Sequence, residues 1–493
     1  MVPFEHCGNV RLGQPSLSDL RRMIRRGTSG GRIRAAAALL FGLSLPSTAF
    51  AAGGAEDGDN LSEVVGLLVV VGVAYLITDF LVERLQRRLL AVSGLEYMVL
   101  GVLLGPLVPQ IRAFDDLTGL LPIIALAAGW FGILRGVELS YAHIKDAPTG
   151  TIQLALADDL IGGLFVAVPA LYFFQSGLLG PVDGAQAWMS AGVLGCCGAV
   201  GSTEPIDVVK SRYHVEGKTI PLLRRAARLG DAIALFVFGI LFCVIRQDVS
   251  VAPLTALIGR PMSGIEWSVL ALLLGAGLGF LFRFFLAGDE SENGRFLALV
   301  GIVSFAAGAA WFLDLSSLML NLVLGAVIVN TAKVGTQIRS TLERTQRPMT
   351  LVLLVFAGAL WVPPPMVHAA WVALFAEGAT LGAGMAGLAS AVFLWVLLPP
   401  VALFVARTAG KALGSRLAST GQTFRPDLFR GLLGMGDVTV AMAISFRLVY
   451  EGAAVEVAYT TILGSVVLHD LVAPRLLRSL LVDSGELRRE QKS

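Results

Sequence analysis

Charged side chains are scarce in this chain. They make up 15% of its 493 residues, whereas about a quarter is usual in soluble proteins, so an ordinary soluble enzyme is excluded. Lys and Arg (38) nearly balance Asp and Glu (36), and a net charge of +2 argues against a nucleic-acid partner. The four cysteines, Cys7, Cys196, Cys197 and Cys243, lack metal-ligand spacing. We therefore expect no disulfide framework, no zinc site and no cofactor.

Apolar residues dominate instead. They account for 55% of the chain, and the mean hydropathy is +0.74. A helix that spans a bilayer needs roughly 20 mostly apolar residues, so more than half of this chain is available for such spans. The 56 glycines suit helices that pack closely within a membrane. The composition predicts an all-α polytopic membrane protein, with lipid as its surroundings.

The first 60 residues differ from the rest. Arginines at 21–34 precede an apolar run at 35–45, which is followed by Pro46 and small residues around 49–51. This order is typical of a secretory signal peptide, so residues 1–60 are expected to be a signal peptide and a short external N-terminus. A short first membrane helix is the alternative, although an apolar run of about 11 residues falls short of a span.

Hydropathy predicts thirteen spans within a membrane domain at 61–480, with residues 366–380 as a connection and a further short helix there as the alternative. Lys and Arg gather in alternate loops, including 84–88, 210–225, 333–347 and 411–425. We expect the protein to lie in the inner (plasma) membrane. Because cytoplasmic loops are rich in Lys and Arg, the N-terminus is expected on the outer side and the tail at 481–493 in the cytoplasm. The spans lie near 63–82, 94–110, 117–137, 148–174, 186–208, 222–245, 265–287, 295–312, 316–333, 348–364, 385–412, 428–449 and 455–478.

Several ionisable residues fall inside these spans, where a charge is costly, so each is a functional candidate. Some have simpler explanations. Arg407, Lys411 and Arg135 can extend to the membrane surface, which is the interpretation we favour for Arg135. Asp437 can be interfacial, Asp231 can be solvated, and His469 can be a packed, hydrogen-bonded histidine. The candidates are Asp158, Asp159, Glu204, Asp231, Arg407, Lys411, Asp437, His469 and Asp470.

Two spans carry signals for a helix break. Pro205 removes a backbone donor and disfavours helical geometry at Glu204, in the fifth span. Gly431, Gly434 and Gly436 weaken the twelfth span. Non-helical backbone at membrane depth is tolerated only where it lines a cavity or is buried in protein. Interrupted helices at corresponding positions of two halves are typical of the binding site of an inverted-repeat transporter.

The ordered motifs of residues 94–478 resemble the monovalent cation:proton antiporter superfamily, the sodium/proton exchangers of the NhaA, NapA and NhaP type. The motifs are Leu100 to Pro106, Arg135 to Leu139, Ser202 to Pro205, Gly230 and Asp231, Leu315 to Leu318, Arg407 to Lys411, and Ala473 to Arg478.

This resemblance implies a homodimer in which a core domain moves against a dimerisation domain. The core helices are expected at about 148–245 and 385–478, and the dimerisation helices at about 63–137 and 265–364.

The resemblance also assigns roles to residues. Asp231 is similar to the ion-binding acid of the family, and Glu204 takes the place of the motif's aspartate. Arg407 looks like a basic residue of the core, and we expect it to compensate charge together with Lys411 and Asp437. The chain departs from the family at Gly230, where an Asn or a first Asp is usual.

These residues predict exchange of a monovalent cation, Na⁺ first and K⁺ or Li⁺ next, against H⁺, without enzyme chemistry. Asp231 and the Thr203 hydroxyl are expected to hold the dehydrated cation. Glu204 is also expected to be an ion- or proton-binding residue, and Asp158 and Asp159 rank behind as further ones. Because Gly230 cannot titrate, the exchange is expected to be electroneutral. A K⁺ efflux system of channel type on the same fold and a transport-inactive sensor or partner subunit are the alternatives.

Overall fold

The computed structural model describes residues 94–104, 121–145, 147–215, 217–245, 260, 262–286, 292–331, 335–374, 381–420, 422 and 424–487. All of them belong to one compact unit, Leu67–Ser493. Within these ranges every regular element is a helix, which confirms the all-α prediction. The predicted signal peptide and the first span, at 63–82, lie outside the described residues.

Six helical stretches of the described chain are long and apolar enough to cross a membrane. The protein is therefore a multi-pass membrane protein, as its composition predicts. The stretches are α7 (Thr151–Gln175), α10 (Thr219–Val244), α12 (Gly264–Leu286), α13 (Glu292–Phe312), the run of α17 (Leu381–Val392), η4 (Phe393–Leu397) and α18 (Leu398–Ser419), and α20 (Ala453–Asp483).

The remaining helices are shorter or more polar. One prediction was wrong: part of the segment 366–380 forms α16 and is not a simple connection, because Pro365 occupies a first helical turn, where a missing N–H costs nothing. The shorter or more polar helices are α4 (Leu95–Leu104), α5 (Leu121–Glu138), α6 (Tyr141–Lys145), α8 (Gly184–Ala199), α9 (Glu204–Tyr213), α14 (Ser317–Thr331), α15 (Gly335–Ala359), α16 (Pro365–Leu374), η5 (Leu428–Gly431) and α19 (Asp437–Val449).

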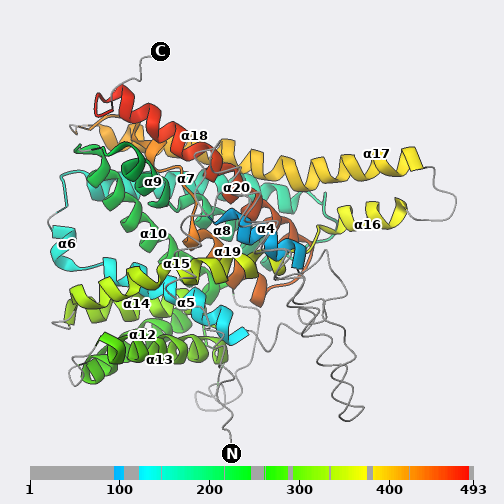
Figure 1. The fold of residues 1–493 in the computed structure, drawn as a ribbon. Helices are drawn as coiled ribbons and strands as arrows, with labels where there is room; N and C mark the ends of the chain where they lie inside the picture. The colour runs from blue at the N-terminus through cyan, green and yellow to red at the C-terminus, as the bar shows by residue number, and fades with distance from the viewer. Residues whose placement is uncertain are drawn as a thin grey trace, which may run out of the picture. The chain divides into compact units, whose positions relative to one another are not determined.

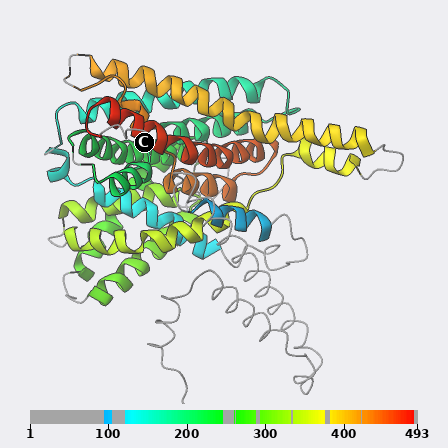
Figure 2. The same cartoon turned by 45° about the horizontal axis from the view of Figure 1, so that its top comes forward.

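The helices pack in two groups. In one group, α5 packs against α13, α14 and α15, and α12 packs against α14. In the other, α7 packs against α8 and α18, and α18 against α20. Figures 1 and 2 show α17 and α18 as one long stretch along the second group. Two helices join the groups: α10 contacts α5, α7, α8 and α14, and α19 contacts α5, α8, α15 and α20.

Glycine permits a close helix crossing in the first group. A Cβ atom at Gly136 of α5 would lie 2.1 Å from the carbonyl oxygen of Leu322 in α14. A Cβ at Gly325 of α14 would in turn lie 2.6 Å from the carbonyl oxygen of Ile133. The two backbones therefore touch directly, as small residues allow in membrane helices. This contact fixes the end of α5 that carries Arg135 and Glu138.

Candidate functional site

Two helices are interrupted, and their non-helical segments meet. The chain is non-helical between α8 and α9 (200–203) and between η5 and α19 (432–436). The backbone N–H of Ser202 donates to the carbonyl oxygen of Gly434, 3.0 Å away. A Cβ at Gly434 would lie 2.8 Å from Pro205, and one at Gly436 would lie 2.5 Å from the Ser202 hydroxyl. Pro205 and these two glycines therefore account both for the breaks and for the close contact between them.

Arg407 joins the two interruptions. Its side chain comes from α18 and is fully buried. The guanidinium donates to the carbonyl oxygens of Gly198 and Gly434, each 3.0 Å away, and also to those of Val200 and Leu433. These carbonyls lie where helical hydrogen bonding stops, so one cationic side chain satisfies acceptors from both segments. Its positive charge also faces the negative C-terminal end of α8.

Lys411, one helical turn further along α18, neutralises the paired aspartates of α7. Its Nζ atom is fully buried and lies against Asp158, 3.5 Å from Asp159 Oδ1 and 2.9 Å from the carbonyl oxygen of Ala199. The alternative in which Lys411 extends to the membrane surface is therefore wrong. Two adjacent acids and one lysine share a site from which water is largely excluded.

Asp231 of α10 lies beside the first interruption. Its side chain is fully buried, so the solvated alternative is wrong. Its Oδ1 atom accepts a hydrogen bond of 3.1 Å from the backbone N–H of Gly201. Its Oδ2 atom lies 3.0 Å from Nε of Arg135 in α5. We expected Arg135 to extend to the membrane surface, but it is 4% exposed and turns inward, because the buried carboxylate offers it a counter-charge.

Arg135 belongs to a longer series of ion pairs that sequence reasoning missed. Its NH1 atom lies 3.2 Å from Oε2 of Glu138, and Oε1 of Glu138 lies 3.2 Å from Nε of Arg228 in α10. The alternating series Asp231, Arg135, Glu138, Arg228 thus crosses twice between α5 and α10. The available signal was the spacing of Arg135 and Glu138, which places them on one face of an otherwise apolar helix.

Gly230 leaves room for a carboxylate from another helix. A Cβ at this position would lie 2.2 Å from Oδ2 of Asp159. Gly230 has no side chain where the family resemblance places an Asn or a first Asp, and Asp159 of α7 fills that space. Thr203 lies in the same interruption as Gly201, the backbone donor to Asp231, and is 7% exposed.

A further acid lies at the other interruption. Asp437, at the start of α19, is 3% exposed, so the interfacial alternative is wrong. Its Oδ2 atom accepts from Gln346 Nε2 (3.0 Å) and Thr350 Oγ1 (2.9 Å) of α15. Glu204, at the start of α9, lies near the same contact, because a Cβ atom at Gly436 would be 3.2 Å from its Oε2 atom. Asp437 and Glu204 thus lie on the two sides of the contact between the interruptions.

The last candidates lie in α20. Nδ1 of His469 is 2.7 Å from the carbonyl oxygen of Ser465, and its ring packs on Phe404 with centroids 4.8 Å apart. This is the packed, hydrogen-bonded histidine of the simpler interpretation. Asp470 is 5% exposed. Across the described ranges, no three His, Cys, Asp or Glu side chains form a cluster able to hold a metal ion.

The described chain is thus a multi-pass membrane protein with two interrupted helices in contact and buried acids on both sides of that contact. A solved structure of the sodium proton antiporter MjNhaP1 from Methanocaldococcus jannaschii at pH 8 aligns with 85% of this chain and 99% of that chain, with a TM-score of 0.53 and 15% identity. A map of the same antiporter from electron microscopy covers 88% and 99%, with a TM-score of 0.46 and 15% identity. No protein-family model matches the chain, and no curated protein matches its sequence. The chain has the fold of a sodium/proton antiporter.

Proposed function

We propose that the protein exchanges a monovalent cation, Na⁺ first and K⁺ or Li⁺ next, against H⁺ across the inner membrane. The observation that carries this proposal is the fully buried carboxylate of Asp231 beside the meeting point of two interrupted helices. An ionisable residue at membrane depth next to broken helices is typical of an ion site in secondary transporters. The antiporter fold supports the same reaction.

Coupling follows from the ion pair between Asp231 and Arg135. Asp231 lies in α10, which belongs to the proposed core, and Arg135 lies in α5 of the first helix group. An unloaded carboxylate stays bound to Arg135 and so holds the two groups together. A proton or a cation on Asp231 neutralises the carboxylate and weakens this pair, which allows the groups to move. Empty sites then do not cross, and each crossing carries either a cation or a proton, as alternating access requires.

The cation needs hard oxygen ligands. Asp231 supplies one, Asp159 is the nearest further carboxylate to Gly230, and the carbonyls of the interruption are close by. The Thr203 hydroxyl joins them once the segment 200–203 adjusts. Lys411 keeps Asp158 and Asp159 partly neutralised throughout. The cycle therefore exchanges one proton per cation at Asp231 and is electroneutral.

The assembly we propose is a homodimer with its N-terminus outside and its C-terminus in the cytoplasm. The core, 148–245 and 385–478, moves against a dimerisation domain that includes 265–364. Large apolar side chains are exposed on α12 and α13, among them Leu273, Leu297 and Phe305. Such a surface is suited to lipid or to a second copy of the chain.

Dye-reported proton flux in everted vesicles tests the exchange, with Na⁺, Li⁺, K⁺ and Rb⁺ added in turn. Wild type is expected to dissipate the pH gradient with at least one cation, and Asp231→Asn is expected to lose this response. Asp183→Asn is the matched control, because Asp183 is exposed before α8. Full exchange by Asp231→Asn, in protein present at the wild-type level, would remove Asp231 as the carrier.

A further inference from the structure

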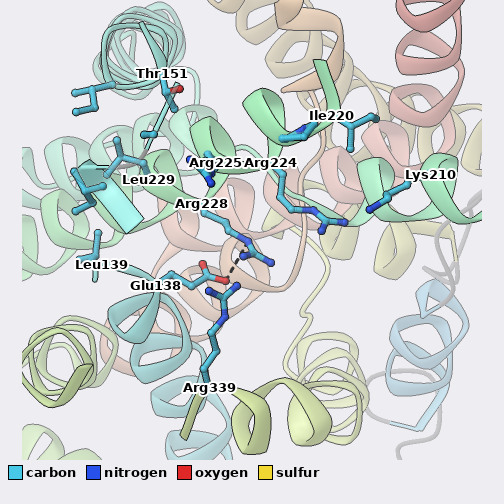
Figure 3. A pocket seen from close by; sticks show the side chains of 14 residues that line it. Glu138, Leu139, Thr151, Lys210, Ile220, Arg224, Arg225, Arg228, Leu229 and Arg339 are labelled. Atoms are coloured by element: carbon cyan, nitrogen blue, oxygen red, sulfur yellow. Dashed lines mark ion pairs between the residues drawn. The ribbon is translucent and has the colours of Figure 1, made fainter. Parts of the chain in front are cut away.

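A strongly basic cavity lies between α5, α10 and α15, near the candidate ion site but distinct from it. Its volume is about 280 Å³. Figure 3 shows arginines from α10 and α15 directed toward Glu138, with Arg228 and Arg339 on opposite sides of that carboxylate. The basic residues among its described lining are Lys210, Arg224, Arg225, Arg228 and Arg339, and Glu138 is the one acid among them.

Two carboxylates outside the described lining pair with these arginines. Arg224 pairs with Asp207, and Arg339 pairs with Glu343 at 2.9 Å, but neither acid lines the cavity. Arg228 and Arg339 both act on Arg224 as like charges. Positive groups held this close, partly out of water, are costly unless an anion joins them.

One donor also lacks an acceptor. Within the described chain, Nε of Arg224 is buried and has no hydrogen-bond partner. Guanidinium groups present several donors in a fixed fork that matches the oxygens of a phosphate, so a cavity lined by arginines selects that chemistry over a halide. Basic pockets between membrane helices on the cytoplasmic side are known to suit phosphorylated headgroups. The proposed topology places these residues at the cytoplasmic end of the bundle.

The geometry points to a binding site for a phosphate group in this cavity, held by Arg224, Arg228 and Arg339. The phosphate belongs either to an anionic lipid headgroup or to a free phosphate. Because Arg228 and Arg339 come from α10 and α15, a bound phosphate bridges these two helices. Glu138 lines the same cavity and pairs with Arg135, so the site also connects to Asp231. An effect of the bound phosphate on Asp231 would regulate transport, and this consequence rests on the proposed antiport. The binding of the phosphate itself does not.

Isothermal titration calorimetry on the delipidated full-length protein in neutral detergent tests the site. The probes are inorganic phosphate and, separately, dihexanoyl phosphatidic acid, with chloride at equal ionic strength as the blank. The test variant is Arg224→Gln with Arg339→Gln. The control variant is Arg416→Gln with Arg475→Gln, which removes the same charge from two exposed positions.

We expect one phosphate per chain, with binding at least tenfold weaker in the test variant and unchanged in the control. Binding of both probes would identify a site for phosphate in general, and binding of the lipid probe alone would identify a headgroup as the ligand. Absence of binding by both probes, or equal weakening in both variants, would overturn the proposal. Since transport is not measured, such a failure leaves the antiport proposal standing.

Discussion

At the scale of single residues, the site is a set of buried charges that neutralise one another across helices. Asp231 pairs with Arg135, and Lys411 pairs with Asp158 and Asp159. Each pair joins residues that are distant in the sequence and buried in the fold. Removing one member therefore leaves a buried, uncompensated charge. The effect of a substitution therefore depends on which partner it strands.

Lys411→Ala strands Asp158 and Asp159 in a buried site. Breaking a buried ion pair on one side costs about 3–5 kcal/mol, so we expect a marked fall in the unfolding temperature in detergent. Arg416→Ala, at an exposed position on the same helix, is expected to unfold like wild type. Adding Asp158→Asn to Lys411→Ala is expected to restore part of the loss. An unchanged unfolding temperature for Lys411→Ala would show that the aspartates do not depend on it.

Arg135→Gln changes the pH profile of exchange instead. Without the guanidinium, the carboxylate of Asp231 loses a positive neighbour 3.0 Å away and holds its proton more tightly. A cation then displaces the proton only at higher pH. The pH of half-maximal exchange in everted vesicles is expected to rise, and Arg283→Gln, at an exposed position, should leave it unchanged. A profile that stays in place or moves to lower pH would contradict the proposed ion pair.

At the scale of helices, one side chain secures both interruptions. Arg407 donates to carbonyls on either side of the contact between the segments 200–203 and 432–436. Geometry matters here as much as charge, because these acceptors need donors that diverge from a planar group. The interruptions are therefore expected to tolerate no other cation at this position.

Arg407→Lys keeps the charge and loses the fork. A buried carbonyl left without a donor costs about 1–3 kcal/mol, and the single ammonium group of a lysine does not reach acceptors that diverge around a planar guanidinium. We expect a lower unfolding temperature and slower exchange than in Arg416→Lys, the matched change on the exposed side of α18. Wild-type stability and rate in Arg407→Lys would show that charge alone suffices.

The sequence predicted the helices better than it predicted the contacts between them. Apolar runs predicted the long helices, and Pro205 and the glycines at 431–436 marked where two of them weaken. The hydropathy window missed the start of α15 because Gly335 to Arg347 are polar yet favour helix. The partner of Asp231 was missed because it depends on how α5 crosses α10, and that crossing is set by packing, which one sequence does not reveal.

At the scale of the whole molecule, the described helices form two groups joined through α10 and α19. The proposed exchange requires that these groups shift relative to each other while the two interruptions stay in contact with each other. The proposed topology also gives the molecule a defined orientation. In that orientation, the basic cavity and the loops rich in Lys and Arg lie on the cytoplasmic side.

Labelling of single cysteines in a cysteine-free background tests that orientation. Ser176 and Thr420 are both exposed, at the ends of α7 and α18. In spheroplasts, a membrane-impermeant maleimide is expected to label Ser176→Cys at once and Thr420→Cys only after permeabilisation. The reverse pattern would invert the topology and place the basic cavity outside the cell.

The central claim, exchange carried by Asp231, is tested most directly by ²²Na⁺ uptake into liposomes that contain the purified protein. With a pH gradient acid inside, wild type is expected to accumulate ²²Na⁺ until the gradient is dissipated, and Asp231→Asn is expected to show only background uptake. The membrane voltage, set by valinomycin and K⁺ gradients, should leave the rate unchanged if the exchange is electroneutral. Gradient-driven uptake by Asp231→Asn equal to that of wild type would contradict the account.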